Sequence, residues 1–283
     1  MPIKFNIATI LPYKENYTVD GAQAAAIWVA DFYKYSTFKK TNYIYGNTIK
    51  KNYLTKNYIN IKITGLNKIL SSSTNEYCKN FIKKIDKKNF DLIEIHNRPH
   101  VFNYLKNKIV SKYILYIHND PLSMSGSKTI KERLNLLNTV DKIIFVSEWV
   151  QLRFFKDIDP KLITQTEIIY PSIHKDKKIY KKNKNIIFVG KLNVSKGYDL
   201  YKDAILKILD EFNDWKAFSI GDENRDRPTI NHKNHKELGF LKHKEVLNFL
   251  KKSEIAVVPS RWEEPFGRTA LEASSRACAT IIS

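Results

Sequence analysis

Two groups of residues in the second half of the chain have the types and spacing needed to bind a charged ligand. In the first group, an apolar run over residues 186–189 leads into Gly190, and Lys191 and Lys196 follow before a helical pattern begins. Ligands of open α/β sheets bind outside the carboxyl ends of strands, and cations placed there can neutralise a pair of phosphates. This group predicts a diphosphate site, and the alternative is a turn that carries surface lysines.

The second group follows an apolar run over residues 255–258. Glu264 precedes a helix expected to begin near Phe266 and Gly267, and Glu272 lies about one and a half turns inside it. A helix N-terminus offers free N–H groups to an anionic ligand, and nearby carboxylates can accept hydrogen bonds from sugar or ribose hydroxyls. The alternative is that Glu264 only complements the helix dipole and that Glu272 is solvated.

The strands and helices that must position these groups alternate along the chain, which is typical of βαβ units around a parallel sheet. Helical faces are expected in residues 76–87 and 198–212. Strands are expected at residues 5–11, 59–63, 91–95, 113–117, 142–146, 167–170, 185–189, 215–220, 254–258 and 280–282. The pattern predicts the α/β fold class with two Rossmann-like domains.

A lysine-rich segment with few large apolar residues interrupts this alternation. We therefore predict a first domain over residues 1–173, a linker over 174–184 and a second domain over 185–283. The second domain ends directly after a predicted strand, without closing helices, and we expect it to be incomplete.

The composition excludes several classes of protein. Hydrophobic residues make up 43% and charged residues 27% of the 283 positions, which argues against disorder. No apolar run has the length of a membrane span, and the N-terminus has no leader pattern. Cys78 and Cys278 give no disulfide framework, so a cytoplasmic location is expected. Asp157-Ile158-Asp159 lies outside any strand end and the histidine pairs lack a third ligand, so no metal site is predicted.

The positive charge of the chain points to an anionic partner. The formal net charge is +19, and residues 32–75 contain no acidic side chain. Such a field attracts anionic lipid headgroups, phosphorylated substrates or nucleic acid. The alternative is a composition rich in Lys, Asn, Ile and Tyr that follows from an AT-biased genome. Within the acid-free stretch the lysines are Lys34, Lys39, Lys40, Lys50, Lys51, Lys56, Lys62 and Lys68.

Several motifs occur together in an order that resembles the retaining GT-B glycosyltransferases of glycosyltransferase family 4 (glycosyl transferases group 1). Several motifs in order are far more specific than any single one. The motifs are Gly190-Lys191-Leu192 with Lys196-Gly197, Ser219-Ile220-Gly221-Asp222, Leu238-Gly239-Phe240-Leu241, Pro259-Ser260, Glu264-Pro265-Phe266-Gly267 and Glu272-Ala273.

The resemblance implies a role for each motif. By likeness to the family, Lys191 and Lys196, beside Gly190, would stabilise the departing nucleoside diphosphate. Glu264 would contact hydroxyls of the donor sugar, and Glu272 would hold the ribose.

Two further parts of the donor site follow from the same likeness. The amides of Phe266 and Gly267 would face the sugar and the diphosphate. Gly239, Phe240 and Leu241 would line the pocket of the base.

The resemblance extends less sharply into the first half of the chain. His118 follows a strand, at a position where many family members have a donor-contacting histidine. The glycine pair that the family has after its first strand is reduced to Gly21-Ala22, with Gly21 as the remaining donor contact. Lys191 stands where the family has arginine, which keeps the charge but lacks the bidentate fork.

The resemblance implies a metal-independent, hexosyltransferase-type enzyme without a cofactor. It would move a sugar, with retention, from a nucleotide-diphosphate-sugar donor to a saccharide or lipid-linked acceptor. A role in cell-surface polysaccharide or lipopolysaccharide synthesis is expected, with peripheral association at the inner face of an anionic membrane. The alternatives are a GT-B-fold epimerase or phosphorylase, and a non-catalytic polyanion-binding protein. Nucleic acid is not the expected partner.

Overall fold

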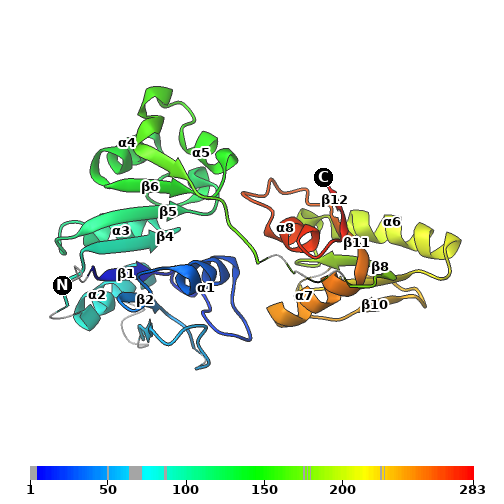
Figure 1. Ribbon diagram of the computed structural model, residues 1–283. Helices are drawn as coiled ribbons and strands as arrows, with labels where there is room; N and C mark the ends of the chain where they lie inside the picture. Colours follow the sequence, from blue (N-terminus) through cyan, green and yellow to red (C-terminus); the bar gives the residue numbers. More distant parts are fainter. Residues whose placement is uncertain are drawn as a thin grey trace. The chain divides into compact units, whose positions relative to one another are not determined.

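Two parallel sheets organise the chain, one in each of two units (Figure 1). The computed structural model describes residues 5–49, 51–63, 72–85, 88–174, 176, 178, 180–223, 225 and 227–283. Unit 1 is Met1–Ser172 and unit 2 is Ile173–Ser283. The predicted α/β class with Rossmann-like domains is confirmed.

The sheet of unit 1 has seven strands in the order β3-β2-β1-β4-β5-β6-β7. Its first strand therefore lies between the second and the fourth, which is the switch point of a doubly wound sheet. The strands are β1 (Ile7–Ile10), β2 (Asn42–Gly46), β3 (Tyr58–Asn60), β4 (Leu92–His96), β5 (Lys112–Ile117), β6 (Lys142–Phe145) and β7 (Thr166–Ile168).

Helices cover both faces of this sheet. Ile44 of β2 packs in the cluster that contains Ala26 and Val29, while the next residue, Tyr45, lies edge-on to Phe81 with ring centroids 5.0 Å apart. Successive side chains of a strand point to opposite faces, so α1 and α2 cover opposite sides. The helices are α1 (Ala24–Tyr35), α2 (Ser73–Ile85), α3 (Pro99–Leu105), α4 (Ile130–Thr139) and α5 (Glu148–Phe154), with 3₁₀ turns at Pro121–Ser123 and Pro160–Gln165.

The sheet of unit 2 has five strands in the order β10-β9-β8-β11-β12. Ile186 and Phe188 pack on one face with Tyr201, whereas Ile187 packs on the other with Leu250. The strands are β8 (Asn183–Val189), β9 (Lys216–Ile220), β10 (His235–Glu237), β11 (Ser253–Val258) and β12 (Ala279–Ile282), and the helices are α6 (Tyr198–Glu211), α7 (His243–Lys252) and α8 (Arg268–Ser274), with a 3₁₀ turn at Val194–Lys196.

The structure differs from the predicted elements at β2, β3 and β10. We predicted neither β2 nor β10, because β2 is a five-residue strand inside the lysine-rich stretch and β10 is three polar residues, His-Lys-Glu. The strand predicted at 59–63 is observed over Tyr58–Asn60.

The predicted linker also needs correction at its C-terminal end. Strand β8 begins at Asn183, and the Lys182 ammonium donates to the carbonyls of Leu250, at 3.1 Å, and Arg276, at 2.6 Å. Asp176 pairs with Lys251 at 2.6 Å. Both side chains have partners within unit 2. The charged segment predicted as a linker is therefore not exposed throughout. Residues 175, 177 and 179 of the predicted linker lie outside the described residues.

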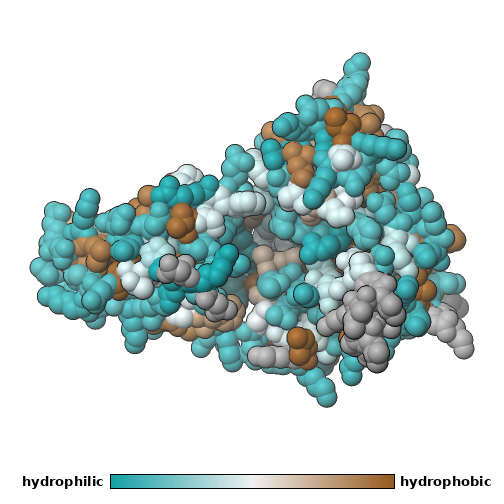
Figure 2. Space-filling view, turned by 180° about the vertical axis from the view of Figure 1, so that it is seen from behind, coloured by the Kyte–Doolittle hydropathy of each residue, from teal (hydrophilic) through white to brown (hydrophobic). Residues whose placement is uncertain are grey.

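The face of the molecule shown in Figure 2 is mostly polar, as expected for units with internal cores. Apolar residues form small separate groups on it. Among the described residues, no helix is both long enough and apolar enough to cross a membrane. Cys78 and Cys278 are both buried and unpaired.

A half-buried carboxyl group, that of Glu94, lies within the sheet of unit 1. The Thr9 hydroxyl donates to Glu94 Oε2 at 2.6 Å, and the Tyr116 hydroxyl lies 3.5 Å from Glu94 Oε1. Burial raises the pKa of the Glu94 carboxyl above its ordinary value of 4.5, although both hydroxyls act to lower it. Folding therefore favours the protonated form of this side chain.

Two loops of unit 2 approach each other so closely that glycine is required at one position. Gly197 has φ +69°, and a Cβ placed there would lie 1.7 Å from the carbonyl oxygen of Pro259. Gly267 has φ +72°, yet no atom lies within 4 Å of its hypothetical Cβ. The first glycine is needed for both conformation and space, and the second for conformation alone.

We predict that Gly197→Ala lowers the free energy of unfolding by about 2 kcal/mol or more, because the left-handed conformation and the steric overlap both penalise alanine. Gly267→Ala is the matched control and should cost only about 1 kcal/mol, from the conformation. Urea denaturation measures both. Equal losses in the two variants would contradict the close approach of the loops.

We also predict that Glu94→Gln changes the free energy of unfolding in a pH-dependent way. The change should be more stabilising at pH 7 than at pH 4.5. A carboxyl whose folded pKa is raised imposes a penalty that appears as the pH rises above the unfolded pKa. Glutamine is neutral, so it carries no such penalty at any pH. The difference in unfolding free energy between variant and wild type should therefore grow from pH 4.5 to pH 7 in chemical denaturation. Glu254→Gln, at an exposed position of β11, controls for loss of charge, and a pH-independent difference at Glu94 would contradict the assignment.

Candidate functional site

The structure brings together Lys196 and Glu264, two predicted site residues that lie far apart in the sequence. Lys196 Nζ forms an ion pair with Glu264 Oε1, and the same oxygen accepts a hydrogen bond of 2.9 Å from the Ser260 hydroxyl. Strands β8 and β11 are parallel neighbours, so the loops at their carboxyl ends meet at one edge of the sheet. The two predicted groups of residues therefore lie together at one edge of the sheet, as a single candidate site.

Backbone and side-chain hydrogen bonds fix the two loops to each other. The carbonyl of Ser195 accepts from the backbone N–H groups of Arg261, at 3.1 Å, and Trp262, at 3.0 Å. The Asn193 side chain accepts from the N–H of Lys196 at 3.2 Å. The backbone of Lys196 is thus held by Asn193, and its side chain is held by Glu264 of the facing loop, before any ligand binds.

Glu272 lies inside α8 and is only 5% exposed. Its Oε1 accepts from Arg268 Nε at 2.8 Å and interacts with His243 Nε2 at 2.9 Å. Burial acts to raise the pKa of Glu272, but the hydrogen bonds and charges of His243 and Arg268 hold this pKa below its ordinary value. The carboxylate is therefore ionised at neutral pH, and the alternative of a solvated helix residue is wrong.

Sequence reasoning missed both partners of Glu272. Arg268 stands four residues before it, a spacing at which side chains of a helix meet, so that contact had a signal. His243 is 29 positions away at the start of α7. No local pattern relates those two residues.

A cavity of about 450 Å³ opens beside Glu264. Trp262 and Phe266 give it apolar walls, and Gly267 and Ser260 also line it. An aromatic surface beside a carboxylate and a hydroxyl suits a ring that carries hydroxyl groups.

The remaining predicted residues of unit 2 surround this region in different ways. Lys191 is exposed on the loop that begins at Gly190. The carbonyl of Gly239 accepts from the N–H of Gly221 at 2.9 Å. Leu241 packs on the core, while the Phe240 ring is 62% exposed. Of the predicted base-pocket residues, Phe240 therefore has the accessible ring face.

His118 lies in unit 1, directly after β5, in a group of rings. Its Nε2 is 2.9 Å from His96 Nδ1, and the Trp28 ring lies edge-on with centroids 4.6 Å apart. Burial lowers the pKa of His118 to about 3. The imidazole is therefore neutral at pH 7 and can serve as a hydrogen-bond donor or acceptor, but not as a cation.

Gly21 lies in the turn before α1. The side chain of Glu15, a residue that precedes this turn, reaches the N-terminus of the helix. The N–H of Gly21 donates to the carbonyl of Thr18 at 3.4 Å. The Glu15 carboxyl accepts from the N–H of Ala26 at 3.0 Å, and its pKa is raised by burial. One N–H at this helix N-terminus thus already has a side-chain partner, which sequence reasoning did not anticipate.

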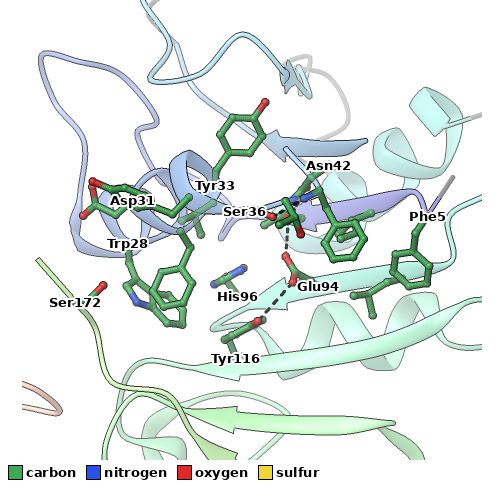
Figure 3. A pocket seen from close by; sticks show the side chains of 18 residues that line it. Phe5, Trp28, Asp31, Tyr33, Ser36, Asn42, Glu94, His96, Tyr116 and Ser172 are labelled. Atoms are coloured by element: carbon green, nitrogen blue, oxygen red, sulfur yellow. Dashed lines mark hydrogen bonds between the residues drawn. The ribbon is translucent and has the colours of Figure 1, made fainter. Parts of the chain in front are cut away.

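A second cavity, of about 590 Å³, lies between α1 and the sheet of unit 1 (Figure 3). Trp28 and Tyr116 line it together with three polar residues, Asn42, Glu94 and His96. Apolar rings with hydrogen-bonding groups between them suit a neutral ligand. No sequence pattern indicated this cavity, because its polar residues are interspersed within strands.

The metal-like motif Asp157-Ile158-Asp159 forms a turn. Asp157 has φ +62°, and Asp159 caps the following 3₁₀ turn by accepting from the N–H of Lys161 at 2.9 Å. In the part of the chain that the structure describes, no three or more His, Cys, Asp or Glu residues are grouped as metal ligands would be.

The chain is similar to known proteins in sequence and in structure. Residues 170–283 match the family described as glycosyl transferases group 1. The uncharacterized glycosyltransferase MJ1178 of Methanocaldococcus jannaschii is 31% identical over 198 residues, which cover 66% of this chain and 54% of that protein. Spore coat protein SA of Bacillus subtilis is 23% identical over 235 residues, covering 71% of this chain and 61% of that protein.

A solved structure extends the likeness to both units. Anabaena Alr3699/HepE in complex with UDP-glucose is 13% identical, with a TM-score of 0.71 over 98% of this chain and 80% of that one. This level of identity shows the fold alone. The chain spans about half the length of the first curated relatives that it matches. The comparisons therefore show the GT-B fold for the chain and a match of residues 170–283 to the family described as glycosyl transferases group 1.

Proposed function

We propose that the protein transfers a sugar from a nucleotide-diphosphate-sugar donor to an acceptor. The observation that carries this proposal is the pairing of Lys196 with Glu264 at the edge of a sheet whose residues match a glycosyltransferase family. In this proposal Lys196 is the cation for the diphosphate and Glu264 the carboxylate for the sugar hydroxyls, so the two parts of the donor would meet at this ion pair. UDP-glucose in the structurally similar HepE supports a uridine-type donor.

Lys196 and Lys191 would offset the negative charge that develops on the leaving diphosphate, without a divalent ion. An ammonium has three N–H donors, so Lys196 can keep Glu264 and still donate to phosphate oxygens. Each such contact is worth about 2 to 4 kcal/mol in the barrier, by analogy with a lost oxyanion-hole donor. The proposal names no nucleophile.

The finer assignments rest on the family resemblance. Glu272 would hold the ribose, Phe240 would contact the base, and the amides of Phe266 and Gly267 would face the sugar and diphosphate. His118 and Gly21 remain predicted donor contacts. Because His118 is neutral, it would act through a hydrogen bond.

We further propose retention of the anomeric configuration, a hexosyl donor and a saccharide or lipid-linked acceptor. We also propose a role in cell-surface polysaccharide or lipopolysaccharide synthesis, and the similarity to a spore coat protein supports the cell-surface part of this proposal. An epimerase or phosphorylase of the same fold would use the same donor site without an added acceptor, so product analysis separates these reactions.

The donor is tested by thermal-shift measurements with a panel of nucleotide sugars, with and without EDTA. A ligand at 100 times its dissociation constant stabilises by about 2.7 kcal/mol. We predict stabilisation by one donor series that is insensitive to EDTA and is lost in Lys196→Ala and Glu272→Ala. Lys207→Ala, exposed on α6, is the control and should respond as wild type does.

The opposite outcome supports the polyanion-binding alternative. In that case no nucleotide sugar shifts the melting temperature, Glu272→Ala is tolerated, and DNA or RNA binds with a steep dependence on salt.

We propose peripheral membrane binding through the C-terminal end of α1 and the loop after it. Tyr35 is 66% and Phe38 45% exposed, and amphipathic rings favour a membrane interface. A groove of about 690 Å³ is lined by residues next to them in the sequence, among them Lys34 and Lys39. Four lysines line that groove: Lys34, Lys39, Lys40 and Lys56.

Cosedimentation with vesicles tests this surface. Each lysine near anionic lipid contributes roughly 1 kcal/mol, so binding should be strong with phosphatidylserine vesicles at low salt and weak with phosphatidylcholine vesicles. Lys39→Ala combined with Lys40→Ala should weaken it, whereas Lys202→Ala combined with Lys207→Ala on α6 should not. No preference for anionic vesicles in the wild-type protein would rule the surface out.

A further inference from the structure

The two oxygens of the Glu272 carboxylate have different surroundings. Both hydrogen bonds from side chains, from Arg268 and His243, reach Oε1. Within the described residues, Oε2 accepts no hydrogen bond and keeps contact with solvent. One oxygen is therefore anchored and the other is available.

This asymmetry has a physical cause. An ionised carboxylate in a buried place needs compensating hydrogen bonds and charge, and Arg268 supplies the charge from the preceding turn of α8. His243 comes from a different helix, α7. A single partner on the same helix leaves a glutamate side chain several rotamers, whereas a second partner from another helix selects one.

We infer that His243 is a positioning residue for the donor, which fixes Glu272 so that Oε2 accepts hydrogen bonds from the ribose hydroxyls. The inference rests on the proposed function and deepens it. His243 donates through Nε2 to Oε1 and does not itself touch the nucleotide. Its side chain is 31% exposed and that of Glu272 7%, which places the histidine beside the carboxylate at the margin of the buried region.

The same contact could serve only the packing of α7 against α8. A packing role affects the binding of every nucleotide equally, through stability. A positioning role affects only ligands that have hydroxyls to donate to Oε2. The ratio of affinities for a ribonucleotide and its dideoxy counterpart therefore distinguishes the two roles.

The experiment measures dissociation constants of ribonucleoside diphosphates with the four common bases, and of their 2′,3′-dideoxy forms, by isothermal titration calorimetry. Hydrogen bonds to a charged acceptor predict that wild type prefers the ribose form by about tenfold or more. His243→Leu should reduce this ratio to near one. His243→Gln, whose amide N–H can reach the position of Nε2, should restore it, whereas the shorter His243→Asn should not.

Three comparisons keep the result interpretable. Lys244→Gln, on the same helix and exposed, should leave the ratio unchanged. If His243→Leu does not fold, by circular dichroism, the pair His243→Gln and His243→Asn still provides the test. An unchanged ratio in the folded histidine variants, together with a lost ratio in Glu272→Ala, would overturn the positioning role while leaving the donor site intact. If wild type binds none of the diphosphates, the proposed function itself fails.

Discussion

The close approach of two loops in unit 2 is the constraint on which the candidate site depends. The loop after β8 carries Lys196, the loop after β11 carries Glu264, and Gly197 lets them touch because a side chain there would overlap the Pro259 carbonyl. The parallel pairing of β8 with β11 brings the loops to one edge of the sheet. Without this packing, the lysine and the glutamate would be two unrelated surface charges.

Two glutamates, Glu272, which is buried, and Glu94, which is half-buried, show how local partners decide the charge of a carboxyl group. Glu272 has an arginine and a histidine against one oxygen, and its pKa is lowered despite burial. Among the described residues, Glu94 has hydroxyl partners only, and loss of water around it raises its pKa. A hydroxyl compensates the loss of water less well than a cation does. Unit 2 thus keeps a fixed negative charge at its candidate ribose site, whereas unit 1 keeps a carboxyl group that folding drives toward neutrality.

Much of this arrangement could be predicted from the sequence, because buried parallel strands are short apolar runs and the groups that follow them lie at one edge of a sheet. On that basis Lys196, Glu264 and Glu272 were predicted as candidate donor-site residues. The hydrogen bonds that hold these three side chains in position were not predicted. Asn193 and His243 act through contacts set by the packing of loops and helices, and neither stands in a pattern of its own. Strand β2 was missed for a related reason. The lysine-rich sequence around it is typical of an exposed segment, but the strand is held in the sheet by its pairing with β1.

The difference between Lys191 and Lys196 follows from the same packing. Lys196 is held by the Asn193 cap and by Glu264, so little conformational entropy remains to be lost when a diphosphate binds. Lys191 is exposed, and ordering its long side chain would offset part of the Coulombic gain. Electrostatic stabilisation is most effective when the charge is already in position. Lys196 should therefore lower the reaction barrier by more than Lys191 does, although both side chains carry the same charge.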